Sequence, residues 1–275
     1  MKLFLYRLSL TENLQVSLFD AIERDSRPEP RYQYLKRQFE RDFRFEYRKG
    51  IKLRYQHTQT DGDVIAGAVC RWISEDIEAD PSDPFVVSES GHWEKAAFFF
   101  NIGDDEQVFG LEQNPRVGLP QSVMTQLAKT INALTEGHPY KIDVFSVNTS
   151  HAFRDAVLAY PGPITSLTFD LVIPNPTDAE GKTKKALKKL RKITNGGRFK
   201  STTTSEEGLK VDNPLTRDAA KYAEDGGGDI VAKSGSDKVY DSKKTVKVVE
   251  IEEKFRPDGS EKDGLSDATS DKLKR

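Results

Sequence analysis

Apolar and polar residues alternate along residues 2–10, which predicts a β-strand at the start of the chain. Residues 12–24 instead carry apolar residues four apart, the spacing of one helix face, and therefore predict a helix. Over residues 31–48 apolar side chains recur three and four apart. This spacing predicts either one basic helix or a helix that runs into a strand.

Two β-hairpins are expected next. Residues 50–73 form two strand-like runs around Asp61-Gly62, a dipeptide typical of tight hairpin turns. Residues 94–114 repeat this arrangement around an acidic turn at 104–106. The stretch 75–91 between the hairpins is acidic, contains two prolines and is expected to be a loop.

The second half of the chain mixes helices and strands. A helix is predicted over 120–136, because Pro120 suits the first helical turn and apolar residues follow at helical spacing. Thr177 and Glu180 form a capping-box pattern before a lysine-rich helix over 178–195. The other expected elements are strands over 138–148, 164–174, 199–211 and 245–255, a short helix over 150–158, and a helix over 213–224 that starts at Asn213-Pro214.

These elements predict an α+β fold in which antiparallel β-hairpins pack with helices and a basic helix lies on the surface. The prolines at 174 and 176 are the best candidate for a boundary. They divide an N-terminal α+β domain, residues 1–174, from residues 175–255, which hold the basic helix and a C-terminal α+β subdomain. Residues 256–275 have too few apolar side chains to offset an ordering cost of about 1–2 kcal/mol per residue, so we expect a disordered tail.

Charge is distributed unevenly along a chain whose net charge is only −2. Residues 24–54 contain 11 Lys and Arg against 5 acids, and residues 182–200 contain 9 Lys and Arg with no acid. Residues 75–113 contain 11 acids and one Lys. This asymmetry indicates a surface with a basic face and an acidic face.

The composition restricts the cellular compartment in which the protein is expected. Cys70 is the single cysteine, so no disulfide can form within the chain and nothing indicates an oxidising compartment. No apolar stretch approaches the ~18–20 residues of a membrane helix, and the apolar run before Arg7 is too short for a signal peptide. We therefore expect a cytoplasmic protein without a membrane partner.

Motifs for catalysis are sparse. The four histidines are scattered, and neither a nucleotide-binding glycine loop nor a serine-nucleophile elbow is present, so we expect no metal and no cofactor. One alternative remains open. Asp241 and Glu252 could hold Mg²⁺ while Lys254 steadies an attacking water, as in a metal-dependent nuclease. A carboxylate-x-lysine triplet is common in so charged a chain, and a solvated edge strand is the favoured explanation, so the expectation leans away from an enzyme.

The lysine-rich helix is the strongest candidate for a binding surface. Ala186, Leu190 and Ile193 form one stripe, which is expected to dock the helix. Cations occupy the other positions: Lys184, Lys185, Lys188, Lys189, Arg191 and Lys192. No acid pairs with them in sequence, so they are expected to contact a phosphate backbone. The alternatives are a solvated helix face, an acidic protein surface and a membrane surface.

A second set of candidate nucleic-acid contacts lies in the 24–54 segment, at Arg37, Arg41 and Arg44. Aromatic residues alternate with these arginines and could stack on unpaired bases. The aromatics could equally be buried in the core with the arginines at its rim, and we expect this second arrangement for the aromatics.

Several segments resemble a bacterial family known as domain of unknown function 4747. They are VIAGAVCRWI, AAFFFNIGDDEQVFGLEQN with the helix LPQSVMTQLAKTINAL, TSLTFDLVIPNPTD and AEDGGGDIVAKSG. The resemblance spans roughly residues 1–252, and its most specific element is the junction 171–178. A looser likeness is to the Rex exclusion protein of phage lambda, a DNA-associated abortive-infection component. The resemblance implies a mobile-element or phage-defence context and supplies no catalytic residues.

Three functions follow from these observations. The leading one is a non-enzymatic DNA- or RNA-binding protein with a role in phage defence as a sensor or effector. The second is the metal-dependent nuclease described above. The third is an interaction module that forms a homo-oligomer, in which the basic face of one chain meets the acidic 75–113 face of another.

Overall fold

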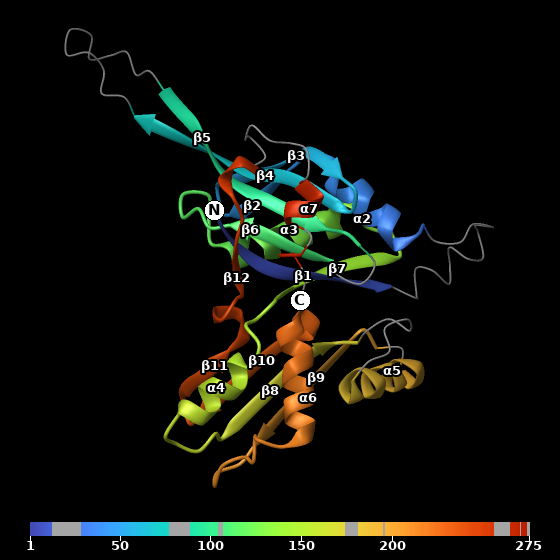
Figure 1. Cartoon of the computed structure of the whole chain (residues 1–275), viewed down its shortest axis with the longest axis vertical. Coiled ribbons are helices and arrows are strands. Elements are labelled where there is room, and N and C mark those ends of the chain that lie inside the picture. Colours follow the sequence, from blue (N-terminus) through green and yellow to red (C-terminus); the bar gives the residue numbers. More distant parts are fainter. Residues whose placement is uncertain are drawn as a thin grey trace.

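The computed structural model describes residues 1–12, 29–76, 89–103, 107–173, 181–194, 196–255, 265–269 and 271–273 (Figure 1). They form an α+β fold with two antiparallel sheets, as the sequence predicted. The large sheet has the order β12-β1-β6-β5-β4-β3-β2, with β7 paired to β1, and the small sheet has the order β11-β10-β8-β9. We call the parts built on these sheets the large lobe and the small lobe.

The large sheet consists mainly of hairpins between neighbours in sequence. Its strands are β1 (Lys2–Glu12), β2 (Phe43–Arg48), β3 (Ile51–Asp61), β4 (Val64–Asp76), β5 (Glu89–Asn101), β6 (Val108–Glu112), β7 (Tyr140–Ser146) and β12 (Val248–Glu250). Both predicted hairpins are present. The basic segment 31–48 is a helix followed by a strand, because α2 (Arg31–Phe39) ends before β2 begins.

Aromatic and aliphatic side chains fill the core between the large sheet and its helices α2 and α3 (Pro120–Leu134). Phe39 of α2 contacts Phe98 and Phe100 of β5, and α3 buries one stripe that includes Val123 and Leu127. The aromatics of the 31–48 segment are therefore core residues, as expected, because β2 alternates buried aromatics with exposed polar residues.

The C-terminal tail differs from the expected disorder in the residues that the structure describes. Residues 265–269 form α7 (Leu265–Thr269), and Leu265 and Leu273 are buried on the opposite face of the large sheet from α3. Leu273 packs above Gly110, which has no side chain to block it. Two leucines in one apolar site supply the burial that the composition of the whole tail did not suggest.

The small lobe is a four-stranded sheet with helices on one face. The strands are β8 (Ser166–Val172), β9 (Arg198–Thr204), β10 (Gly228–Ser234) and β11 (Asp237–Asp241), and the helices are α4 (Ala152–Ala159), α5 (Lys182–Thr194) and α6 (Pro214–Tyr222). Leu167, Leu171 and Ile230 lie in the core beneath these helices. The proposed boundary at 174 falls between β8 and β9, which are paired neighbours in this sheet.

The two lobes meet at the triglycine Gly226–Gly228, where a π-helical turn (Ala223–Gly227) leads into β10. A Cβ atom on Gly226 would lie 2.5 Å from Cβ of Arg7 in β1, and one on Gly228 would lie 2.7 Å from Cα of Leu171 in β8. Asn148, which follows β7, ties the same junction by donating its side-chain N–H to the carbonyl of Ser242. The absence of a side chain at Gly226 thus permits the close approach of the lobes, and its absence at Gly228 permits the close approach of β10 to β8 within the small lobe.

Other predictions differ in detail. The helix over 12–24 and the capping box at Thr177 and Glu180 lie outside the described residues, apart from Glu12 in β1. The last strand is shorter than predicted, since only β12 pairs with β1, and β11 was not predicted at all. No helix in the described part of the chain is both long and apolar enough to cross a membrane.

Candidate functional site

Helix α5 is anchored on the small lobe by one narrow stripe. Thr183 and Leu187 are buried, Leu190 is half-buried, and the amide of Thr183 donates a hydrogen bond to Asp218 of α6. The sequence predicted a docking stripe of Ala186, Leu190 and Ile193, and of these only Leu190 lies on the observed stripe. Ala186 and Ile193 are exposed, because Gly181 (φ +90°) and the Asp218 contact set the start and rotation of the helix.

The outward side of α5 carries lysines. Lys182, Lys185, Lys189 and Lys192 are exposed, and none forms an ion pair with another described residue. The predicted contacts Lys184, Lys188 and Arg191 are half-buried instead, on the flanks of the helix. The structure therefore divides the six predicted cations of the helix into an exposed set and a flanking set.

Strand β9 follows α5 in sequence and is also basic. It is an edge strand, paired only with β8, and its residues are largely exposed. Lys200 is exposed and has no ion-pair partner among the described residues, whereas Arg198 is paired with Asp170. Lys200 is paired in register with Asp170 and therefore lies on the open face of the small sheet, away from α5. We define the basic face by the exposed lysines of α5 that have no ion pair to a described residue: Lys182, Lys185, Lys189 and Lys192.

The second set of predicted contacts is less available. Arg37 makes a bidentate ion pair with Glu29, at 2.7 and 3.2 Å, and Arg41 is half-buried. Arg44 is exposed on the solvent side of β2. These three arginines belong to the large lobe, so they are part of a different sheet and helix layer from the basic face.

The nuclease alternative relied on Asp241, Glu252 and Lys254, which the structure does not bring together. Asp241 lies at the end of β11, where Lys238 contacts it at 2.9 Å. Glu252 lies beyond β12, beside the N-terminus of β1, and pairs with Lys254 at 3.5 Å. Within the described ranges, no three His, Cys, Asp or Glu side chains are grouped so that they could hold a metal ion.

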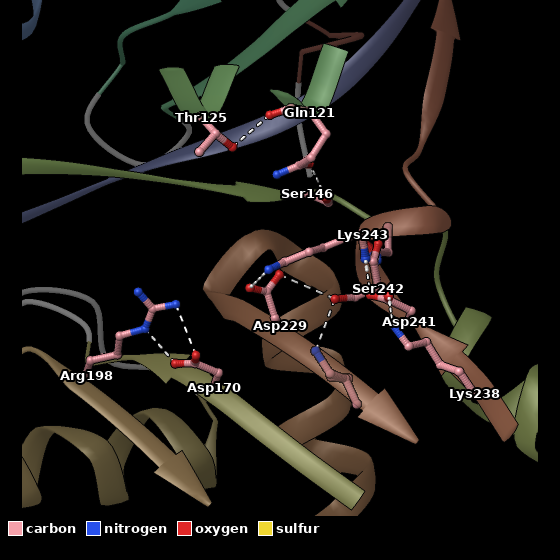
Figure 2. Close-up of polar contacts among 12 residues, drawn as sticks. Gln121, Thr125, Ser146, Asp170, Arg198, Asp229, Lys238, Asp241, Ser242 and Lys243 are labelled. Carbon is pink, nitrogen blue, oxygen red and sulfur yellow. Dashed lines mark hydrogen bonds and ion pairs between the residues drawn. The ribbon is translucent and has the colours of Figure 1, made fainter. Parts of the chain in front are cut away.

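A cluster of charges that sequence reasoning missed lies on the open face of the small sheet, near β7 (Figure 2). Asp170 and Asp229 are directly paired positions of β8 and β10. Asp170 forms a bidentate ion pair with Arg198, at 2.5 and 3.2 Å, and Asp229 contacts Lys243 at 3.3 Å. Arg198 also lies over the ring of Phe145, so the cluster joins the lobes.

Burial dominates the electrostatics of this cluster. It raises the pKa of Asp229 above the ordinary value, and this shift is opposed by Lys243. Burial would also raise the pKa of Asp241, but hydrogen bonds from Lys238 and the amide of Lys243 hold it below its usual range. Each carboxylate of the cluster has a cation beside it, as a structural ion-pair network requires. An acid inside an apolar strand, as in TSLTFDLVIP, was the available sequence signal.

A cavity of about 350 Å³ lies between α4 and α6. Glu224 lines it and is buried, and its carboxylate accepts hydrogen bonds from the amides of His151 and Phe153 at the start of α4. Burial raises the pKa of Glu224. Acidic and basic side chains balance around this cavity, so its charge favours no class of ligand.

The family model for a domain of unknown function (DUF4747) matches residues 33–260, which is most of the chain. No curated protein and no solved structure matches it. The matched range includes most of the large sheet, the whole small lobe and the basic face. The chain belongs to the DUF4747 family.

Proposed function

We propose that this protein is a non-enzymatic nucleic-acid-binding protein that contacts phosphates through its basic face. The observation that carries the proposal is the orientation of α5. Thr183, Leu187 and Leu190 face the lobe, while Lys185, Lys189 and Lys192 face solvent without an ion pair to any described residue. A row of unpaired ammonium groups is complementary to the regularly spaced phosphates of a nucleic-acid strand.

A solvated helix face is the competing explanation. Lysines spaced i, i+4, such as Lys185 and Lys189, repel each other by a few tenths of a kcal/mol per pair. Exposed positions of a purely solvated helix can accommodate glutamates that remove this repulsion, but residues 182–200 contain none. A polyanionic partner accounts for the absence of glutamate, because phosphates relieve the repulsion when they bind.

The proposal concerns backbone contacts rather than base recognition. The aromatics of the 31–48 segment lie in the core, so this segment offers no stacking platform for unpaired bases. Phosphate contacts position a protein on nucleic acid but carry no sequence information. We therefore expect weak discrimination between sequences.

The test is a binding titration by fluorescence anisotropy, with duplex DNA, single-stranded DNA, RNA and heparin over a series of salt concentrations. The variant K185E/K189E/K192E should bind far more weakly, and the slope of log affinity against log salt should fall by about 0.7–0.9 for each phosphate that the variant no longer binds. The matched control is K52E/K129E/K141E, which makes the same change in net charge at exposed positions of the large lobe.

Three outcomes decide the matter. If the control binds like the wild type and the α5 variant does not, the basic face is the binding surface. If both variants lose the same affinity, net charge alone attracts the nucleic acid and the proposed face has no special role. If the wild type binds no nucleic acid at low salt, the proposal fails. Incubation with Mg²⁺ in the same samples tests the nuclease alternative.

A cytoplasmic location and a role in phage defence are parts of the same proposal. The second is supported only by the resemblance described above. It is tested by the plating efficiency of phages on cells that express the wild type or K185E/K189E/K192E. Equal plating on both strains and on cells without the protein would overturn the defence role.

A further inference from the structure

Strand β9 leaves one row of backbone groups open at the edge of the small sheet. The amide of Ile173 donates to the carbonyl of Gly197, and the amide of Ser205 donates to the carbonyl of Thr165. Both bonds continue the β8–β9 register, so the odd-numbered residues of β9 direct their N–H and C=O groups at β8. The even-numbered residues direct theirs outward: Arg198, Lys200, Thr202 and Thr204.

This edge has little of the protection that sheet edges usually have. No hydrogen bond to another described residue satisfies the outward groups, and β9 pairs with β8 over seven residues without a bulge or a proline. The opposite edge strand, β11, is interrupted by a register shift at Ala232 and Lys233. The charge of Arg198 is turned back onto Asp170 of β8. A regular, unpaired edge is a template for a further strand.

The sequence of β9 is complementary to itself in one antiparallel register. Only the even-numbered residues can form the hydrogen-bonded pairs of a β9–β9 ladder, because only their backbone groups point outward. A two-fold axis at Ser201 meets this condition and pairs the whole strand. It places Lys200 opposite Thr202 of the second copy, and Arg198 opposite Thr204 of the second copy. Each cation then faces a β-branched hydroxyl residue rather than another cation, which would repel it.

The neighbouring registers are less favourable. An axis at Lys200 would place two lysines directly opposite each other. An axis at Thr202 would pair fewer residues of the strand, since β9 ends at Thr204. The axis at Ser201 has a further advantage on the helix side of the sheet. There it brings Phe199, which is 36 % exposed, opposite Thr203 of the second copy and covers part of its ring.

We propose that two copies of this protein dimerise by antiparallel pairing of their β9 strands about Ser201. The pairing joins the two small sheets into one continuous sheet. The two-fold axis of an antiparallel pair is perpendicular to the sheet, and the helices of the small lobe cover one face of it, so both α5 helices lie on the same side of the joined sheet (Figure 1). The dimer then presents two basic faces to one nucleic acid. This last consequence rests on the proposed function, whereas the dimer itself does not.

The first experiment is sedimentation velocity of the full chain, without nucleic acid, over a range of concentrations at low and high salt. The mass should rise to that of a dimer and no further, because a two-fold contact is closed. It should persist at high salt, because backbone hydrogen bonds hold the strands together. T202K, which brings a second ammonium group opposite Lys200, should be monomeric, and the control T202V, which adds no charge, should dimerise like the wild type. A monomeric wild type, or unchanged association of T202K, would overturn the proposal.

A charge exchange tests the register itself. K200E/T202K places a carboxylate opposite an ammonium group on both sides of the axis, so it should dimerise although T202K does not. T202E places a carboxylate opposite Lys200 and should dimerise at a lower concentration than the wild type. Recovery in the double variant also shows that T202K is folded. A double variant that stays monomeric contradicts this register.

Cross-linking locates the axis. In this register the two copies of Ser201 form a non-hydrogen-bonded pair, whose Cα atoms lie about 4.5 Å apart, within the range of a disulfide. S201C should therefore form a covalent dimer on mild oxidation, whereas T204C, opposite Arg198, should not. Cys70 is buried and is common to both variants. Equal cross-linking of the two variants would overturn the register. A dimer that binds no nucleic acid supports this contact and rejects the proposed function, and a monomer that binds nucleic acid does the reverse.

Discussion

Replacement of Gly228 by alanine tests whether β10 requires its close approach to β8 at the triglycine. The residue has φ +153°, a region that is essentially limited to glycine and costs other residues about 1–3 kcal/mol. A Cβ atom there would also lie 2.7 Å from Cα of Leu171 and against the carbonyl oxygen of Asp170. Both are backbone atoms in the paired strand β8, so relief requires distortion of the β8–β10 ladder.

The steric term adds about 1–3 kcal/mol, the usual cost of overpacking. The sum, about 2–6 kcal/mol, is a large part of the 5–15 kcal/mol that stabilises an ordinary domain. The assay is urea unfolding followed by circular dichroism, with the free energy of unfolding extrapolated to water. Gly228→Ala should unfold at a much lower urea concentration than the wild type.

Two matched variants separate the contributions. Gly235, in the turn between β10 and β11, has φ +58° and no atom within 4 Å of a built Cβ, so Gly235→Ala should cost only about 1–2 kcal/mol. Gly227→Ala tests the contact alone, since its Cβ would lie 2.5 Å from the carbonyl oxygen of Tyr222. If Gly228→Ala costs no more than Gly235→Ala, the small sheet does not depend on this close approach of β10 to β8.

Three further variants test other parts of the fold. Gln38 is fully buried, and neither polar atom of its side chain has a hydrogen-bond partner among the described residues. Gln38→Met should therefore raise the free energy of unfolding by about 1–3 kcal/mol. A lower free energy of unfolding would indicate that the Gln38 side chain has a hydrogen-bond partner. Leu273→Ala should lower the free energy of unfolding by about 2–5 kcal/mol if the C-terminal tail folds with the large lobe. No change in urea unfolding would show that the tail does not fold with the large lobe. Burial raises the pKa of Asp229, so the folded state holds this proton more tightly than the unfolded chain, and the residue's contribution to stability falls as pH rises from the ordinary aspartate range through the raised pKa. Asp229→Asn should flatten that part of the profile of melting temperature against pH, and an unchanged profile would contradict the shift.

Patterns within one short segment of the sequence predicted the helices and strands that depend on that segment alone. Alternation and the Asp61-Gly62 turn identified the first hairpin, and Asn213, whose side chain accepts a hydrogen bond from the amide of Thr216, marked the start of α6. β11 was missed because its five residues carry few apolar side chains, and its pairing with β10 stabilises it instead. Leu265 and Leu273 were read as tail residues, since their burial site is formed by strands far away in sequence.

The candidate site was predictable in part for a similar reason. Composition alone located the excess of lysine at residues 182–200, but the choice between Ala186 and Leu187 as the docking residue depends on how α5 meets α6. Asp170 and Asp229 are neighbours only through strand register, which the intervening residues do not encode locally.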